Sequence, residues 1–156
     1  MVTEPAIFPV LRKLGEETGK PFTKDRFKGR VRIQKVVFLL KSLGQPEAMD
    51  YNYNLYVNGP YSTDLAKDYY SEGNSLKTGS QEVNIPEARM KIVVEADEKG
   101  VDFMEALTTT ISLATENRSI EDAIKWARDL KPHLASMHWK EVRIFLTAHR
   151  SLIQST

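Results

Sequence analysis

The 156-residue chain contains no cysteine, which excludes disulfides, a thiol nucleophile and zinc held by thiolates. It also lacks a long apolar run: the longest, Val36 to Leu40, is far shorter than the roughly 20 residues that a membrane-spanning helix needs. The first residues form neither a basic nor an apolar segment, so no signal peptide is expected. We therefore predict a cytoplasmic protein that does not contact a membrane and holds neither a metal nor a cofactor.

The chain has little net charge, +1 at neutral pH, but that charge is unevenly distributed. Residues 1–46 carry a net charge of +6, and residues 47–156 carry −5. Local positive charge permits nucleic-acid binding, because affinity comes largely from neutralised phosphates. A basic end and an acidic end would equally serve a protein partner or self-association.

Apolar spacing predicts a mainly α (α+β) fold in one domain, with a winged-helix-like part over residues 1–96 and a C-terminal helical cap over residues 97–156. Helices are expected over residues 6–19, 25–43, 63–72, 101–115, 119–130 and 134–153. Residues 51–57 have the composition of a short strand, and residues 81–85 and 89–94 that of a small β-hairpin, the expected wing. Residues 90–95 also fit a helix, which is the alternative.

The helix over residues 25–43 has apolar residues on two faces. One face holds Ile33, Val36, Val37, Leu40 and Leu43, and the nearly opposite one holds Phe27, Val31 and Phe38. A helix that is apolar on two sides is buried between neighbours, so we expect it at the centre of the core.

The segment Asn58-Gly59-Pro60-Tyr61 predicts a turn that leads into the helix over residues 63–72. Gly59 supplies free φ at the bend, and Pro60 fixes φ for entry into the helix. Ser62 is placed to cap that helix. We interpret this turn as structural, because one glycine without a following lysine is not a phosphate-binding loop.

Two segments together resemble a known family: Arg32 to Leu40 in the central helix, and Tyr56 to Leu65 across the turn. They are similar to the prokaryotic YwgA-like proteins and, more distantly, to the Panacea (SocA-like antitoxin) domain, over roughly residues 10–100. The resemblance implies a mainly helical, winged-helix-like core, and for the antitoxin relatives a role in binding another protein. It supplies no catalytic motif.

A basic stripe on the central helix is the candidate for nucleic-acid binding. Its members, within about 80° of one another at 100° per residue, are Lys24, Lys28, Arg32 and Lys35. Such a stripe could follow a phosphate backbone. The alternatives are a solvated helix face, which is the more common role of charge runs on helices, or cations that pair with the acidic second part of the chain. The helix over residues 63–72, which would enter the major groove, has three carboxylates and one lysine. Nucleic acid is therefore possible as a partner but not favoured.

All six tyrosines of the chain lie within twenty residues, and they are the candidate partner-binding surface. Tyrosine combines a large apolar body with a polar tip, which suits interfaces and pockets. The alternative is that about half of them pack on the central helix. The six are Tyr51, Tyr53, Tyr56, Tyr61, Tyr69 and Tyr70.

Catalysis and metal binding find no support in the sequence. His138 and His149 share a helix face but lie about 16 Å apart, too far for one metal ion. No serine has the setting of an activated nucleophile. The sequence therefore favours a non-catalytic protein-interaction or regulatory module that binds a protein partner or itself. The alternative is a nucleic-acid-binding regulator.

Overall fold

A computed structural model describes residues 4–71, 76, 82–114 and 118–153. Over these residues the chain forms seven α-helices, two short 3-10 helices and one two-stranded antiparallel sheet, which confirms the predicted mainly helical fold with a small hairpin. The elements are α1 (Ile7–Thr18), α2 (Phe27–Ser42), η1 (Pro46–Ala48), β1 (Asn54–Tyr56), β2 (Gly59–Tyr61), α3 (Thr63–Ser71), α4 (Glu87–Glu98), α5 (Val101–Leu113), α6 (Ile120–Leu130), α7 (Ser136–Ala148) and η2 (Arg150–Leu152).

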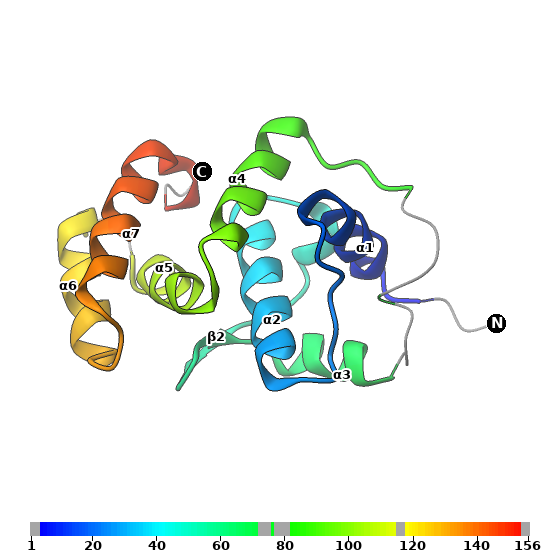
Figure 1. The fold of residues 1–156 in the computed structure, drawn as a ribbon, viewed down its shortest axis with the longest axis horizontal. Coiled ribbons are helices and arrows are strands. Elements are labelled where there is room, and N and C mark those ends of the chain that lie inside the picture. Colours follow the sequence, from blue (N-terminus) through cyan, green and yellow to red (C-terminus); the bar gives the residue numbers. More distant parts are fainter. Residues whose placement is uncertain (1–3, 72–75, 77–81, 115–117, 154–156) are drawn as a thin grey trace.

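Helix α2 occupies the centre of the molecule, in contact with α4, α5, η1 and β2 (Figure 1). Its predicted apolar face is fully buried at Ile33, Val36 and Val37, as expected of a central helix. The second apolar face is only partly buried, because Val31 is covered but Phe27 remains 57% exposed. The prediction of burial on both sides is therefore wrong at Phe27, and this exposed ring borders the candidate site described below.

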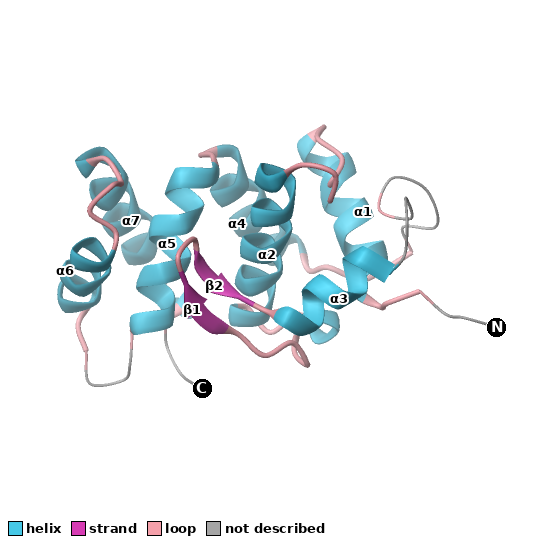
Figure 2. Cartoon of the chain, turned by 90° about the horizontal axis from the view of Figure 1, so that it is seen from below, coloured by secondary structure: helices cyan, strands magenta, loops and turns pink. Residues whose placement is uncertain are grey.

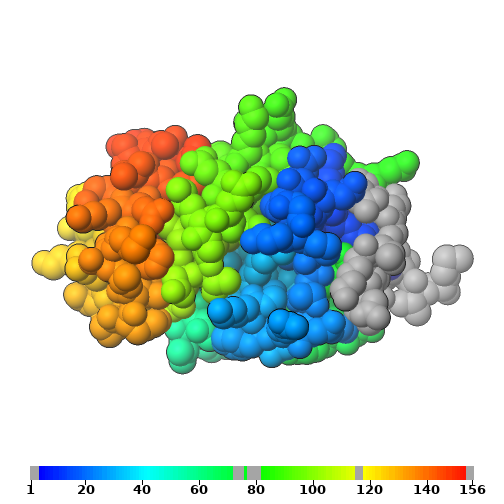
Figure 3. All heavy atoms as spheres, viewed as in Figure 1, coloured from blue at the N-terminus to red at the C-terminus, as the bar shows by residue number. Residues whose placement is uncertain are grey.

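Helix α5 joins the two ends of the molecule. It contacts α2, α4 and β2 on one side and α6 and α7 on the other. Every residue from Phe103 to Ile111 is buried, and the hydroxyl of Thr108 donates to the carbonyl of Met104 at 2.7 Å. A buried threonine within a helix can satisfy its hydroxyl in this way. Helices α6 and α7 then form the predicted C-terminal cap at one end of the surface (Figure 3).

The hairpin predicted from residues 81–85 and 89–94 is wrong. Gln81 lies outside the described residues, residues 82–86 form neither helix nor strand, and residues 87–98 form α4. Met90, Val93 and Ala96 are buried at helical spacing, and α4 packs on α1 and α2. The run from Ile92 to Val94 favours a strand locally. Only a helix, however, places Met90, Val93 and Ala96 on one buried face.

The hairpin instead lies between α2 and α3, where β1 pairs with β2 and Leu55 stands opposite Pro60 (Figure 2). This confirms an extended segment within residues 51–57. Of the segment predicted as a turn, Asn58 lies in the turn but Gly59 to Tyr61 form β2, and only Val57 and Asn58 separate the strands. Pro60 therefore lies in a strand and does not set the entry into α3. Gly59 does adopt the expected unusual backbone, with φ of +96°.

Among the residues that the structure describes, no helix combines the length and the apolar character needed to cross a membrane.

Candidate functional site

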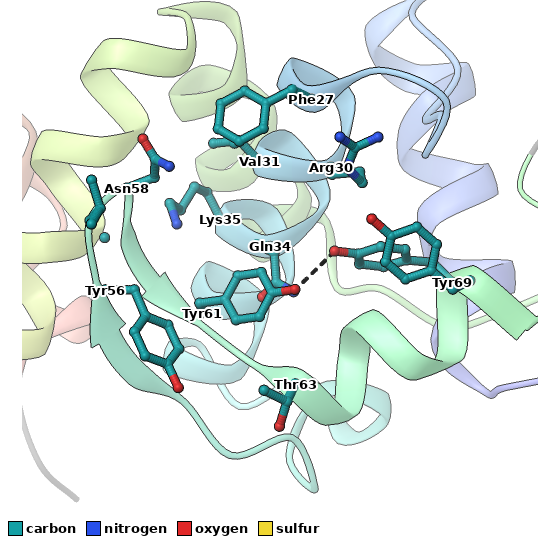
Figure 4. Close-up of a pocket in the computed structure, with 13 residues that line it drawn as sticks. Phe27, Arg30, Val31, Gln34, Lys35, Tyr56, Asn58, Tyr61, Thr63 and Tyr69 are labelled. Carbon is teal, nitrogen blue, oxygen red and sulfur yellow. Dashed lines mark hydrogen bonds between the residues drawn. The ribbon is translucent and has the colours of Figure 1, made fainter.

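A pocket of about 500 Å³ opens where α2, the hairpin and the start of α3 meet (Figure 4). Phe27, Val31 and Arg30 enter it from α2, Tyr56 and Tyr61 from the hairpin, and further tyrosines from α3. Its walls are chiefly aromatic and aliphatic, because five of the lining side chains are rings and two are valines. The lining residues are Phe27, Arg30, Val31, Gln34, Lys35, Tyr56, Val57, Asn58, Gly59, Tyr61, Thr63, Tyr69 and Tyr70. We call this feature the aromatic pocket.

The structure brings four of the six predicted tyrosines to the aromatic pocket. Tyr56 and Tyr70 are exposed at its edge, Tyr61 is half-buried and Tyr69 is buried. The rings of Tyr56 and Tyr61 meet edge to face with centroids 5.6 Å apart. Burial raises the pKa of the Tyr69 phenol, which stays neutral at physiological pH.

The other two tyrosines, Tyr51 and Tyr53, do not line the pocket. The buried Tyr51 donates its hydroxyl to Asp68 at 2.6 Å, and Tyr53 packs edge to face on Phe38 at 5.2 Å. Burial and the Asp68 carboxylate together raise the pKa of Tyr51. These two rings therefore pack at the start of the hairpin and do not belong to the candidate site.

Gln34 fixes the junction between the hairpin and α3. Its amide nitrogen donates to the carbonyl of Ser62 at 2.9 Å, and its amide oxygen accepts from the Ser62 backbone N–H at 2.8 Å. Ser62 in turn accepts the N–H of Leu65 at 3.2 Å, which confirms the predicted cap. All of these groups are buried, so Gln34 holds the pocket wall in register with α2.

A buried charged cluster lies under the hairpin. Lys35 of α2 donates to the carbonyl of Pro60 at 2.7 Å, and Lys131 donates to the carbonyls of Tyr56, at 3.0 Å, and Val57. Glu105 of α5 lies 3.4 Å from the Lys131 ammonium and is itself buried. The two lysines thus anchor both strands of the hairpin by their main chain. We call Lys35, Glu105 and Lys131 the lysine cluster.

Burial lowers the pKa of the Lys35 ammonium to about 7, with Glu105 opposing the shift and Lys131 adding to it. The main cause is desolvation, because burial disfavours the charged form of the amine. Gly59 lies directly against this amine: a Cβ at that position would stand 3.2 Å from Cε of Lys35. The glycine of the predicted turn is therefore also required by a close approach of the backbone to Lys35.

The predicted basic stripe is divided by the fold. Lys28 is exposed and Lys24 half-buried, so both remain at the surface. Arg32 forms a bidentate salt bridge with Asp97, in which the Nε–Oδ1 and Nη2–Oδ2 distances are both 2.9 Å. Its guanidinium also stacks on the ring of Phe22. Lys35 is 1% exposed. Two of the four cations are thus committed to internal contacts, and Arg32 pairs with a carboxylate from the acidic second part of the chain, as one of the alternatives expects.

Within the described ranges, no group of three His, Asp or Glu side chains is placed to hold a metal ion. His133 and His149 each approach a single carboxylate: His133 lies 3.2 Å from Glu105, and His149 lies 3.3 Å from Glu95. Each histidine side chain pairs with a different element of the scaffold. Neither contributes to the aromatic pocket.

Sequence reasoning missed the α2 side of the pocket. The sequence indicates Phe27 and Val31 as part of a second apolar face but predicts that this face is buried against a neighbour, whereas both residues line the pocket. Arg30 belongs neither to that face nor to the basic stripe, and only the structure places it in the pocket. Asn58 and Thr63 carry no periodic signal at all.

The fold and the pocket together define a mainly helical protein with an aromatic recess beside a two-stranded hairpin. No protein-family model, no curated protein and no solved structure matches the chain. The resemblance to YwgA-like proteins and the Panacea domain stays a prediction.

Proposed function

We propose that this chain is a non-catalytic protein-interaction module of the cytosol that holds an apolar side chain of a protein partner in the aromatic pocket. The observation that carries the proposal is the exposure of large apolar side chains around one recess. Phe27 is 57% exposed, Tyr70 57% and Tyr56 50%, and Val57 at the hairpin loop is 81% exposed. Exposed aromatic side chains around a pocket are typical of the residues that dominate protein interfaces.

The polar groups of the pocket favour binding over turnover. Gln34 uses both ends of its amide on Ser62, and Lys35 donates to Pro60. A general acid, a general base or a nucleophile needs a free polar atom within reach of the substrate. Because these two side chains already serve the scaffold, the pocket offers a partner mainly apolar and aromatic contact.

The alternative, a nucleic-acid-binding regulator on the stripe from Lys24 to Lys35, has less support. Of its four cations, Arg32 pairs with Asp97 and Lys35 lies beneath the hairpin. A phosphate backbone requires a series of accessible cations, because each contact releases condensed counterions. We therefore keep this alternative as an outcome of the experiments and not as a second proposal.

The proposal is tested by selection from a random peptide library displayed on phage, with the purified chain as the immobilised target. We expect enriched peptides that share an apolar or aromatic residue and that no longer bind a Phe27→Ser, Tyr70→Ser double variant. Both residues are exposed, so the fold should tolerate the changes. The matched control is Ile144→Ser on α7, which removes a 70% exposed apolar residue away from the pocket and should leave binding intact.

Two results would count against the proposal. One is the absence of any enriched peptide. The other is enrichment of peptides that bind the double variant as well as the wild type. The mass of the protein in solution, measured over a range of concentrations, checks whether the partner is a second copy of the chain. In that case the double variant should dissociate and Ile144→Ser should not.

A further inference from the structure

The charges around the aromatic pocket are of one sign. Of the thirteen described residues that line it, Arg30 is a permanent cation, Lys35 is a buried amine, and none carries a carboxylate. A further cation stands at the edge, because Nζ of Lys24 lies 3.3 Å from the carbonyl of Tyr70 and donates to it. A ligand that enters between these groups therefore meets positive charge and aromatic surface together.

The carboxylates of α3 point away from the pocket. Thr63 and Tyr70 lie within about 20° of each other around the helix, whereas Asp64 and Asp68 lie roughly 100–140° from Thr63. Asp68 accepts the Tyr51 hydroxyl on that other side. Helix α3 thus separates its aromatic residues from its acidic ones and leaves the positive charge of the pocket uncompensated.

The lysine cluster meets the pocket at Lys35. In the lysine cluster, Lys35 reaches in from α2 and Lys131 from the segment after α6, and they share the single carboxylate of Glu105 on α5. His133 approaches the same carboxylate and supplies no negative charge. Burial disfavours the protonated form of Lys35, and an anion bound beside this amine would favour that form.

Arg30 is the residue best placed to receive such an anion. It extends from α2 between Phe27 and Tyr69 (Figure 4) and uses one N–H on the carbonyl of Lys24, at 2.9 Å. A guanidinium has five N–H donors in a planar fork that matches a carboxylate. Arg30 also lines the pocket together with Phe27 and Tyr69, so a carboxylate and an apolar side chain of one ligand could be bound there at once.

We infer that the pocket recognises a segment of a partner protein in which an aromatic or apolar side chain stands beside an aspartate or glutamate. The apolar side chain occupies the space between Phe27, Val31 and Tyr61, and the carboxylate pairs with Arg30. This inference rests on the proposed function and specifies the chemistry of the partner. Acidic peptides are therefore preferred over neutral ones, and basic peptides are rejected.

Single-stranded nucleic acid also combines stacking surfaces with negative charge, but the pocket suits it less well. Strand binding needs a cationic groove that follows several phosphates. Arg32, which would extend such a groove along α2, is tied to Asp97, and Lys35 is covered by the hairpin. The geometry provides for one anion next to one apolar group.

The test uses three capped dipeptides as probes: N-acetyl-aspartyl-phenylalaninamide and its asparaginyl and lysyl counterparts. Binding to the isotope-labelled full chain is followed by the backbone amide shifts of Gly59, Thr63 and Tyr70. The aspartyl and asparaginyl probes are nearly isosteric, so their difference reports the charge. We expect the aspartyl probe to bind about fivefold more tightly than the asparaginyl one, and the lysyl probe to bind most weakly.

The Arg30→Gln variant should remove the preference, so that the aspartyl and asparaginyl probes bind it with equal affinity. Lys140→Gln, an exposed site on α7, should preserve the preference. Amide shifts distant from the pocket report whether either variant alters the fold.

Each outcome decides between the claims. Equal binding of the three probes, or a preference for the lysyl one, overturns the inference and leaves the proposed function standing. Loss of the aspartyl preference in both variants shows a general effect of net charge and overturns the role of Arg30. A thymidine tetranucleotide that binds the same amides more tightly than any dipeptide overturns the choice of a protein partner. If no probe shifts these amides, both the inference and the proposed docking of an aromatic side chain fail.

Discussion

Lys35 combines two properties that oppose each other: it anchors the hairpin through the carbonyl of Pro60, and its ammonium is poorly solvated. The hydrogen bond is useful in either protonation state, because a neutral amine still donates. The charge is costly only while the site is folded. The pH dependence of stability should therefore reveal this residue.

The expected sign follows from the proton count. The pKa of Lys35 is about 7 in the folded protein and 10.5 for an ordinary lysine. Between these values the unfolded chain carries a proton on Lys35 that the folded protein has released, so stability rises with pH. The contribution of Lys35 to the free energy of unfolding is therefore most favourable above the unfolded pKa, and this gain is lost as the pH falls toward 7. The slope is about 1.4 kcal/mol per pH unit at most.

Urea unfolding of the wild type and of Lys35→Met at several pH values between 7 and 10 measures this directly. The free energy of unfolding of the wild type should gain on that of Lys35→Met as the pH rises. Comparison of the two proteins cancels the other titrating groups. A difference that stays constant, or that shrinks with pH, would contradict the assignment. Lys140→Met on the exposed face of α7 serves as the control.

Gly59 supports a second prediction at the residue scale. A Cβ there would lie 3.1 Å from Oγ1 of Thr109 and 3.2 Å from Cε of Lys35, and φ is +96°. Gly59→Ala should therefore lower the free energy of unfolding by roughly 2–4 kcal/mol, from backbone strain and overpacking together. Gly19→Ala shares the positive φ, +71°, but its Cβ would meet nothing within 4 Å.

The Gly19→Ala control should cost only about 1 kcal/mol, since it introduces backbone strain alone. Thermal or urea unfolding of both variants provides the comparison. Equal losses at the two sites would mean that the close approach of Gly59 to Lys35 does not constrain the hairpin.

The sequence predicted residues such as these only in part. The need for glycine at position 59 and the cap at Ser62 follow from local rules, and both are present. The burial of Lys35 could not be predicted, because a lysine on a helix is exposed by default and only the hairpin, which comes from a distant segment, covers it. Likewise, Gln34 has no local signal for its pairing with Ser62.

At the scale of elements, helix ends with N-caps were predictable and the choice between helix and strand was not always so. Ser119 caps α6 by accepting the N–H of Asp122 at 3.0 Å, as the sequence indicates. Residues 89–94 contain Ile92, Val93 and Val94, which satisfy a strand pattern and a helix pattern equally. Packing against α1 and α2 makes these residues helical, and a short stretch of sequence carries no information about that packing.

The two serine caps give a matched prediction for helix starts. Ser119 is exposed and Ser62 is 0% exposed, although each accepts an N–H three residues ahead. Ser119→Ala should cost about 1 kcal/mol, because water can replace the lost bond. Ser62→Ala should cost more, about 2–3 kcal/mol, because it leaves the buried N–H of Leu65 without a partner. Urea unfolding of both variants tests the order, and a larger loss at Ser119 would contradict it.

At the scale of the whole molecule, α5 determines how the parts depend on one another. It packs on α2, α4 and β2 and also carries α6 and α7. Glu105 lies in this helix and meets Lys131, which in turn holds the hairpin. The pocket is therefore anchored by the same helix that supports the C-terminal cap, so the two predicted parts of the chain share one scaffold.

This dependence predicts a single cooperative unfolding transition for the chain, and the aromatic residues allow a direct test. All six tyrosines lie between residues 51 and 70, whereas both tryptophans, Trp126 and Trp139, belong to the cap. Trp139 is 2% exposed, so its fluorescence should change when the cap opens. Near-ultraviolet circular dichroism of tyrosine reports the pocket, and tryptophan fluorescence reports the cap. Because α5 is shared, urea midpoints from the two probes should coincide. A cap that unfolds at lower urea would instead show that α5 holds the pocket together without α6 and α7, and that the chain contains two units of separate stability.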